Sequence, residues 1–170
     1  VQGSDAVISN GYYEDGNGKK IALYSGIRSM EKVNDEKYFY YIGCIIASPG
    51  LCLIRKDAIP FIWKTNILKQ NGADDWLLWT AFLCEGRRFA VNNAYLYIHK
   101  KNEGNWSNDL NKMLDSSEEA MNIAYKLPEY DKRLLDVYKR RLKMRHFYDG
   151  RGTIKKILAY MVNPDIGWRM

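Results

Sequence analysis

Two adjacent carboxylates, Asp74 and Asp75, precede an apolar segment that contains Trp76 and Trp79. Acidic residues are favoured at a helix N-terminus, where Asp74 would serve as the N-cap and Asp75 would interact with the helix dipole. A carboxylate that is fixed in direction and partly shielded by indole rings is also suited to act as a general base, and tryptophan faces can stack on sugars. The residue types alone leave both interpretations open.

Cations gather at two other places in the sequence. His99, Lys100 and Lys101 end an apolar run, and together they offer one potential metal ligand and two charges suited to phosphate oxygens. The alternative is a hydrogen-bonded surface histidine beside two solvated lysines. Arg55 follows the run "LCLI", where it could line a binding site or simply end a strand.

The elements that would position these side chains begin with strands. β-branched and aromatic runs with intervening turn residues predict a hairpin, a buried strand and a later strand, at 5–13 with 21–25, at 51–56 and at 87–100. A helix is expected over 75–85, where apolar residues lie on almost every side and predict burial all round. Gly86 is well placed to end it.

Helical patterns dominate the sequence after about residue 108. Ser116 and Glu119 have the spacing of a capping box for a helix over 114–127, and Pro128 could start the next helix, 129–147. A third helix is indicated by an apolar stripe at Ile154, Ile157, Leu158 and Met161. The chain is therefore expected to be an α/β part, residues 1–107, followed by a helical extension, residues 108–170.

Length and composition indicate a globular protein. The chain has 170 residues, 46% of them hydrophobic, which suits one domain with a substantial core. No apolar run approaches the roughly 20 residues needed to span a bilayer. The three cysteines form no CxxC pair, which favours free thiols in a reducing compartment over a zinc site. The first residue is Val rather than Met, which favours a piece of a longer protein. The reducing compartment that the free thiols indicate would be the cytoplasm.

The basic residues are unevenly distributed. Residues 131–170 contain 11 basic and 4 acidic side chains, whereas the remainder of the chain has a net charge of −1. Such a tail, with "KRRLKMRH" at 139–146, favours attraction to an anionic membrane surface or to nucleic acid, although a solvated helix face would look the same. Nucleic acid is the less expected partner, because no helix-turn-helix, zinc-finger or RNA-recognition pattern is present.

The ordered set of motifs resembles the second half of the family-2 glycosyltransferases, which have the GT-A fold. That family has an acidic pair, an aromatic residue and a "LW" helix, then a glycine and a strand that leads to Tyr-x-x-His-x-x-x-x-Asn-x-Ser. The corresponding residues are Asp74, Asp75, Trp76, Leu78-Trp79, Gly86, Tyr97 through His99, Asn105 and Ser107. The resemblance covers about residues 5–120 and implies a partial GT-A-like, Rossmann-like mixed sheet with flanking helices.

The resemblance also implies a function and roles for particular residues. The longer protein would be an inverting glycosyltransferase that moves a sugar from a nucleotide-sugar to a hydroxyl of a glycan or lipid-linked acceptor, in bacterial surface polysaccharide synthesis. Asp75 would be the catalytic base, with Asp74, Trp76 and Arg55 near the acceptor. His99, with Lys100 and Lys101, would contact a divalent metal, Mn²⁺ or Mg²⁺, or the diphosphate that it neutralises.

Two departures from the family pattern limit this expectation. The first acid is Asp74 rather than the usual Glu, and no convincing Asp-x-Asp motif for metal and nucleotide-sugar is present. The chain is therefore expected to hold the acceptor half, to bind little metal by itself and to be inactive in isolation. A non-catalytic carbohydrate-binding or scaffold module is the alternative. The basic tail would place the longer protein peripherally at the inner face of the membrane.

Overall fold

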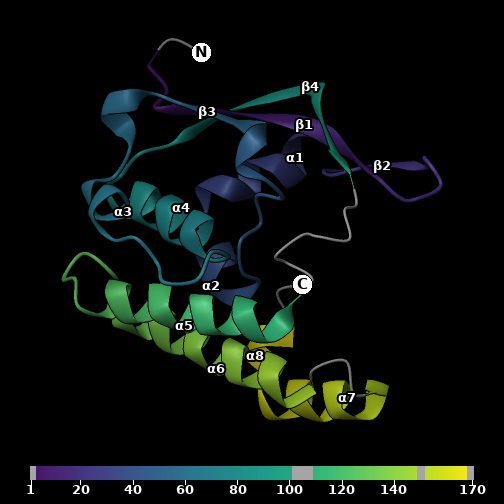
Figure 1. The fold of residues 1–170 in the computed structure, drawn as a ribbon, viewed down its shortest axis with the longest axis vertical. Coiled ribbons are helices and arrows are strands. Elements are labelled where there is room, and N and C mark those ends of the chain that lie inside the picture. The colour runs from purple at the N-terminus through teal and green to yellow at the C-terminus, as the bar shows by residue number, and fades with distance from the viewer. Residues whose placement is uncertain (1–2, 101–108, 149–151, 168–170) are drawn as a thin grey trace.

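The computed structural model describes residues 3–100, 109–148 and 152–167. They form a mixed α/β fold in which the sheet lies at one end, the short helices and α4 form a middle layer, and the C-terminal helices lie at the other end (Figure 1). The predicted fold class, a mixed sheet with flanking helices and a helical C-terminal extension, is confirmed at this level. None of the described helices is long and apolar enough to cross a bilayer.

The sheet is organised around its first strand. Its four strands are β1 (Ala6–Glu14), β2 (Lys20–Ala22), β3 (Cys52–Ile54) and β4 (Phe89–Lys100). β4 runs parallel to β1 along its whole length, whereas β3 and β2 pair antiparallel with the beginning and the end of β1. β2 and β3 must therefore share one side of β1, and β4 occupies the other.

The expected hairpin and the later strand are confirmed, but the buried strand is not. β1 and β2 form the hairpin, and β4 lies within the range 87–100. β3 is only three residues long, and the side chain of Leu53 is 80% exposed. Cys52 and Ile54 pack against the core, so β3 is half-buried, with one face toward solvent despite its apolar sequence.

The middle layer supplies the crossover between the two parallel strands. It contains α1 (Ile27–Met30), α2 (Lys37–Tyr41), α3 (Phe61–Thr65) and α4 (Asp74–Cys84), joined by short 3₁₀ turns. As predicted from its uniformly apolar sequence, α4 is buried on nearly every side from Trp76 to Leu83. Gly86 follows it with φ +76°, which agrees with its predicted role at the helix end.

The last layer consists of α5 (Leu110–Tyr125), α6 (Lys132–Tyr148), α7 (Gly152–Val162) and α8 (Pro164–Gly167). The three expected helices are present with changed boundaries. The second begins at Lys132 rather than directly after Pro128, because a turn intervenes. One hydrophobic core contains residues from α4, α5 and α6, so the helical extension packs directly on the α/β part.

The predicted capping box at Ser116 is wrong. The N-cap of α5 is Asp109, whose side chain accepts a hydrogen bond from the backbone N–H of Lys112 at 3.1 Å. Ser116 instead lies buried inside the helix, where it donates to the carbonyl of Gln70 and accepts from the backbone N–H of Ala73. The Ser116 hydroxyl therefore connects α5 to the loop that precedes α4.

Candidate functional site

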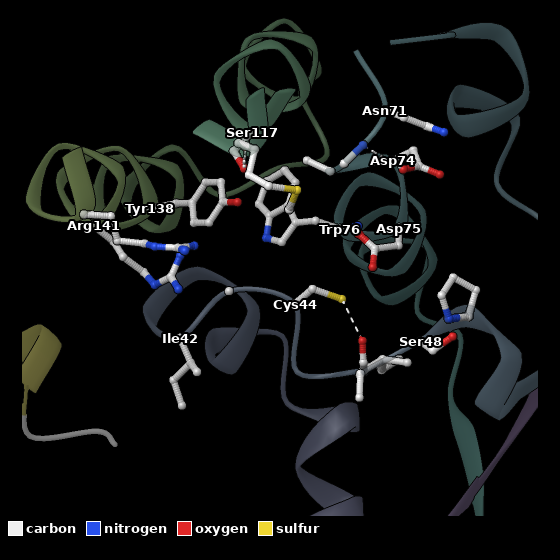
Figure 2. A pocket seen from close by; sticks show the side chains of 18 of the residues that line it. Ile42, Cys44, Ser48, Asn71, Asp74, Asp75, Trp76, Ser117, Tyr138 and Arg141 are labelled. Atoms are coloured by element: carbon white, nitrogen blue, oxygen red, sulfur yellow. Dashed lines mark hydrogen bonds between the residues drawn. The ribbon is translucent and has the colours of Figure 1, made fainter. Parts of the chain in front are cut away.

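A pocket of about 520 Å³ opens beside the start of α4. Its walls come from the segment 42–49 after α2, the start of α4, the end of β4, and facing side chains of α5 and α6. Figure 2 shows Asp74 and Asp75 on one side, Arg141 on the other, and Trp76, Cys44 and Tyr138 between them. Residues far apart in the sequence thus meet around one cavity.

Asp75 is the most perturbed carboxylate of the pocket. Burial raises its pKa to about 6, and the negative charge of Asp74 adds to the increase. Three hydrogen bonds lower the pKa in turn: one from the backbone N–H of Trp76, at 2.7 Å, one from the thiol of Cys44, and one from the backbone of Asp75 itself. A carboxylate with a pKa near 6 is mostly ionised at neutral pH and still basic enough to take a proton.

Asp74 has a different environment from its neighbour. The N-cap position is occupied by Ala73, so Asp74 already lies in the first helical turn and the predicted N-cap role is wrong. Its carboxylate accepts a weak hydrogen bond from the N–H of Gly72 at 3.4 Å, and its carbonyl accepts from the indole of Trp63 at 2.9 Å. Both acids benefit from the helix dipole, as expected for acidic residues in a first turn.

The two tryptophans do not offer open faces for a sugar. Trp76 lines the pocket, but its side chain is only 1% exposed, and its ring is stacked on Tyr138 with centroids 4.3 Å apart. Its indole N–H donates to the carbonyl of Phe39 at 2.9 Å. Trp79 is equally buried and packs against Phe89. Both indoles therefore act as core residues, because α4 is enclosed on all sides.

Two arginines of α6, Arg141 and Arg145, also line the pocket, and Figure 2 shows Arg141 on the side away from the acids. Burial lowers the pKa of Arg141, and the like charge of Arg145 lowers it further, whereas the Tyr138 hydroxyl has the opposite effect. The guanidinium carbon of Arg141 lies 5.9 Å from the centroid of the Tyr138 ring. An added Cβ at Gly43 would be 2.8 Å from a guanidinium nitrogen of Arg141, so the absence of a side chain there makes room for the cation.

Of the described basic residues that the sequence analysis singled out, His99 is the one at the pocket. It lies at the end of β4 and lines the cavity. Lys100 is directed to Glu14, with an N···O distance of 3.6 Å. Arg55 lies outside the pocket lining and pairs with Asp57 at 2.7 Å and Asp5 at 3.7 Å. Lys101 falls outside the described residues.

The described residues do not form a metal site. No three His, Cys, Asp or Glu side chains in the described ranges are grouped so that they could hold an ion. Asp74, Asp75 and His99 all line the pocket, but they do not constitute such a group. The divalent cation expected for the resembled family is therefore not assigned to these residues, and no catalytic step is derived through it.

Sequence reasoning missed several residues of the pocket, above all Arg141 and Arg145. It treated both as part of a generally basic tail. Their i, i+4 spacing, with Tyr138 one turn before, was the available signal, because residues with this spacing share one face of a helix. Ser117 and Cys44 gave no such signal, since only the packing of α5 and of the segment after α2 brings them to the cavity.

No protein-family model, curated protein or solved structure matches this chain. Its function is therefore inferred from the pocket and from the motif order.

Proposed function

We propose that this chain is the acceptor-side part of an inverting glycosyltransferase, with Asp75 as the general base. The observation that carries the proposal is a carboxylate with a raised pKa, fixed at the start of a buried helix and lining a pocket large enough for a sugar. The order of motifs around Asp74 and Asp75, which resembles that of the family-2 glycosyltransferases, also supports the proposal. The proposed substrates are a nucleotide-sugar and a glycan or lipid-linked acceptor.

The proposed reaction is a single displacement at the anomeric carbon. The carboxylate of Asp75 accepts the proton of the acceptor hydroxyl while that oxygen forms its bond to the anomeric carbon. The bond from the anomeric carbon to the diphosphate oxygen breaks, and the nucleoside diphosphate leaves with the electron pair. Because the acceptor attacks from the face opposite the leaving group, the configuration is inverted. The raised pKa favours proton transfer near neutral pH.

The open side of β4 offers a place for a donor-binding part. Among the described strands only β1 pairs with β4, so no described strand occupies the other edge of this 12-residue strand, although the Asn34 side chain bonds both backbone groups of Phe89 at its start. Leu96 is 69% exposed on the same strand. Free edges and exposed apolar side chains commonly receive a further strand or domain. We propose that upstream residues of a longer protein extend the sheet here.

The test is transfer by the longer protein that contains this chain and its upstream sequence. Asp75→Asn keeps the size of the side chain but removes the base, so turnover should fall by roughly 10²–10⁴. Acceptor binding should change little, because the loss concerns the transition state. Asp74→Asn is the matched control and should lose less activity. Turnover of the Asp75→Asn protein within about threefold of wild type would contradict the proposal.

A non-catalytic carbohydrate-binding or scaffold module is the rival function. It predicts that glycans bind to the pocket while no protein containing this chain transfers a sugar from any nucleotide-sugar. An upstream strand that ends in Asp-x-Asp would favour the enzyme, and its absence would favour the module.

We also propose that the helical extension contacts an anionic membrane surface. An apolar groove of about 350 Å³ runs between α6 and α7, lined by Phe147, Leu158 and Val162, with Lys143 at its margin. Met161 of α7 is 71% exposed. Exposed apolar side chains with neighbouring cations are typical of helices that lie in the interface of anionic bilayers. This surface would hold the enzyme close to a lipid-linked acceptor.

A further inference from the structure

We propose that Arg141 and Arg145 form a binding site for a phosphate or diphosphate group inside the pocket that holds Asp75. The binding site itself follows from the two arginines. Only the identity of the molecule that carries the phosphate rests on the proposed function, in which it is the donor or the acceptor of the transferred sugar.

The first argument is that both side chains lie in the pocket and neither has an acidic partner among the described residues. Arg141 and Arg145 are one helical turn apart on α6, and both line the cavity. No carboxylate within the described part of the chain forms an ion pair with either of them. The neighbouring Arg140, in contrast, pairs with Asp165 through two contacts of 2.6 and 3.1 Å.

The second argument is that the position of Arg141 is fixed before any ligand arrives. The Tyr138 ring lies on one side of its guanidinium, and the backbone at Gly43 lies close on another. Tyr138 is in turn held by its stacking on Trp76. A preorganised guanidinium loses little freedom on binding, and its planar set of donors matches the oxygens of a phosphate.

The third argument is that two like charges in a partly buried place favour an anion. Burial and the proximity of Arg145 both act against the charged form of Arg141. A phosphate group between the two side chains would neutralise this repulsion and replace lost hydration with charge-assisted hydrogen bonds.

The arrangement of charges in the pocket also defines the class of ligand. Figure 2 shows Arg141 on the side away from Asp74 and Asp75. The carboxylates would repel an anion placed beside them, but they can accept a hydrogen bond from a hydroxyl. The ligand is therefore a hydroxyl-bearing molecule with a phosphate or diphosphate at one end, as in a nucleotide-sugar or a phosphorylated acceptor.

The experiment measures binding of pyrophosphate to the full chain by isothermal titration calorimetry. Saturable binding is expected for wild type, and Arg141→Gln or Arg145→Gln should weaken it about tenfold or more, because each removes a charge-assisted contact. Arg140→Gln is the matched control, since it removes the same charge one position away and should change the affinity less than twofold. Arg141→Lys keeps the charge but not the planar fork, and should show an intermediate loss. Circular dichroism spectra establish that each variant is folded.

Two outcomes would overturn the proposal: no saturable binding of pyrophosphate to wild type, or an equal loss in Arg140→Gln and Arg141→Gln. Two further probes identify the source of the phosphate. Tighter binding of uridine diphosphate than of geranyl diphosphate assigns the site to the donor, and the reverse assigns it to a lipid-linked acceptor. Asp75→Asn should leave pyrophosphate binding unchanged or slightly tighter. Pyrophosphate binding tests the anion site and sugar transfer tests the general base, so either proposal can be contradicted without the other.

Discussion

The indole of Trp76 lies flat against the phenol ring of Tyr138, with an angle of 5° between the rings and 4.3 Å between their centroids. This pair joins α4, which follows the sheet, to α6 of the helical extension. Both side chains are almost fully buried, at 1% and 3% exposed. The contact therefore forms part of the core and also sets the position of the pocket wall between Asp75 and Arg141.

Tyr138→Ala is expected to destabilise the whole chain. Loss of a buried aromatic ring typically lowers the free energy of unfolding by about 3–5 kcal/mol. Tyr138→Phe keeps the ring and its stacking on Trp76, so it should cost only about 1 kcal/mol. Urea unfolding of the two variants is the measurement. A loss below about 1 kcal/mol for Tyr138→Ala would show that the helical extension does not depend on this contact.

Asp75 should titrate well above an ordinary aspartate. A carbon-13 NMR titration of its carboxyl group should give a midpoint near pH 6, because burial and the charge of Asp74 both disfavour ionisation. Asp74→Asn removes the second cause and should lower the midpoint. A midpoint near pH 4 in wild type would contradict the burial that the structure assigns to Asp75.

The same titration predicts the pH dependence of stability. The folded-state pKa of Asp75, about 6, is higher than the roughly 3.9 of an unfolded aspartate, so between these values the folded state binds the additional proton. The contribution of Asp75 to stability therefore falls as pH rises from about 4 to 6 and then levels off. The free energy of unfolding of Asp75→Asn, relative to that of wild type, should therefore increase by on the order of 2 kcal/mol between pH 4 and pH 6. Urea unfolding at pH 4, 5, 6 and 7 provides the test, and a constant difference between the two proteins would contradict it.

Gly43→Ala should damage the pocket more than an equivalent change elsewhere. The residue has φ +103°, and an added Cβ would lie 2.8 Å from the Arg141 guanidinium, so the backbone is strained and the cation is displaced. Gly18→Ala is the control, because Gly18 has φ +78° and a Cβ added there would meet no heavy atom within 4 Å. Both should lose about 1 kcal/mol of stability, but only Gly43→Ala should weaken pyrophosphate binding. Equal affinities in the two variants would show that Arg141 does not need this space.

The N-terminus of α5 offers a test of the corrected helix cap. Asp109→Ala should lower the free energy of unfolding by about 1 kcal/mol, because the N–H of Lys112 loses its acceptor, whereas Asp109→Asn also caps well and should cost little. Ser116→Ala removes two buried hydrogen bonds and should cost about 1–3 kcal/mol. Chemical unfolding distinguishes these values. An Asp109→Ala protein as stable as wild type would contradict the assignment of Asp109 as the cap.

The membrane contact can be tested by vesicle sedimentation. Wild type should bind vesicles with anionic lipid and release them as salt increases, because each basic residue near the surface contributes about 1 kcal/mol. Replacing Lys143, Lys155 and Lys156 by Gln should reduce binding strongly. A matched control replaces the exposed Lys19, Lys37 and Lys64 of the α/β part, which removes the same charge. Equal binding to neutral and anionic vesicles would leave the basic tail as an ordinary solvated helix surface.

The sequence by itself determined the element order and the position of the two acids. Local patterns were sufficient for the hairpin, for α4 with Gly86 at its end, and for the change from strands to helices near residue 108. These features depend on periodicity, turn residues and helix termini, which act over a few neighbouring positions. The same local information placed Asp75 in the first turn of α4, but it assigned the N-cap to Asp74, whereas Ala73 occupies that position.

Only the tertiary structure decided which side chains share the pocket. The apolar "LCLI" run lies at the edge of the sheet, where Leu53 is exposed. Ser116 is not a helix cap, and its hydroxyl instead bonds α5 to the loop before α4. Arg141 reaches the cavity because α6 packs beside Gly43 and Trp76. The burial of Asp75 and its raised pKa depend on packing between segments far apart in the sequence, such as Cys44 beside Asp75 and Tyr138 on Trp76, which no local pattern encodes.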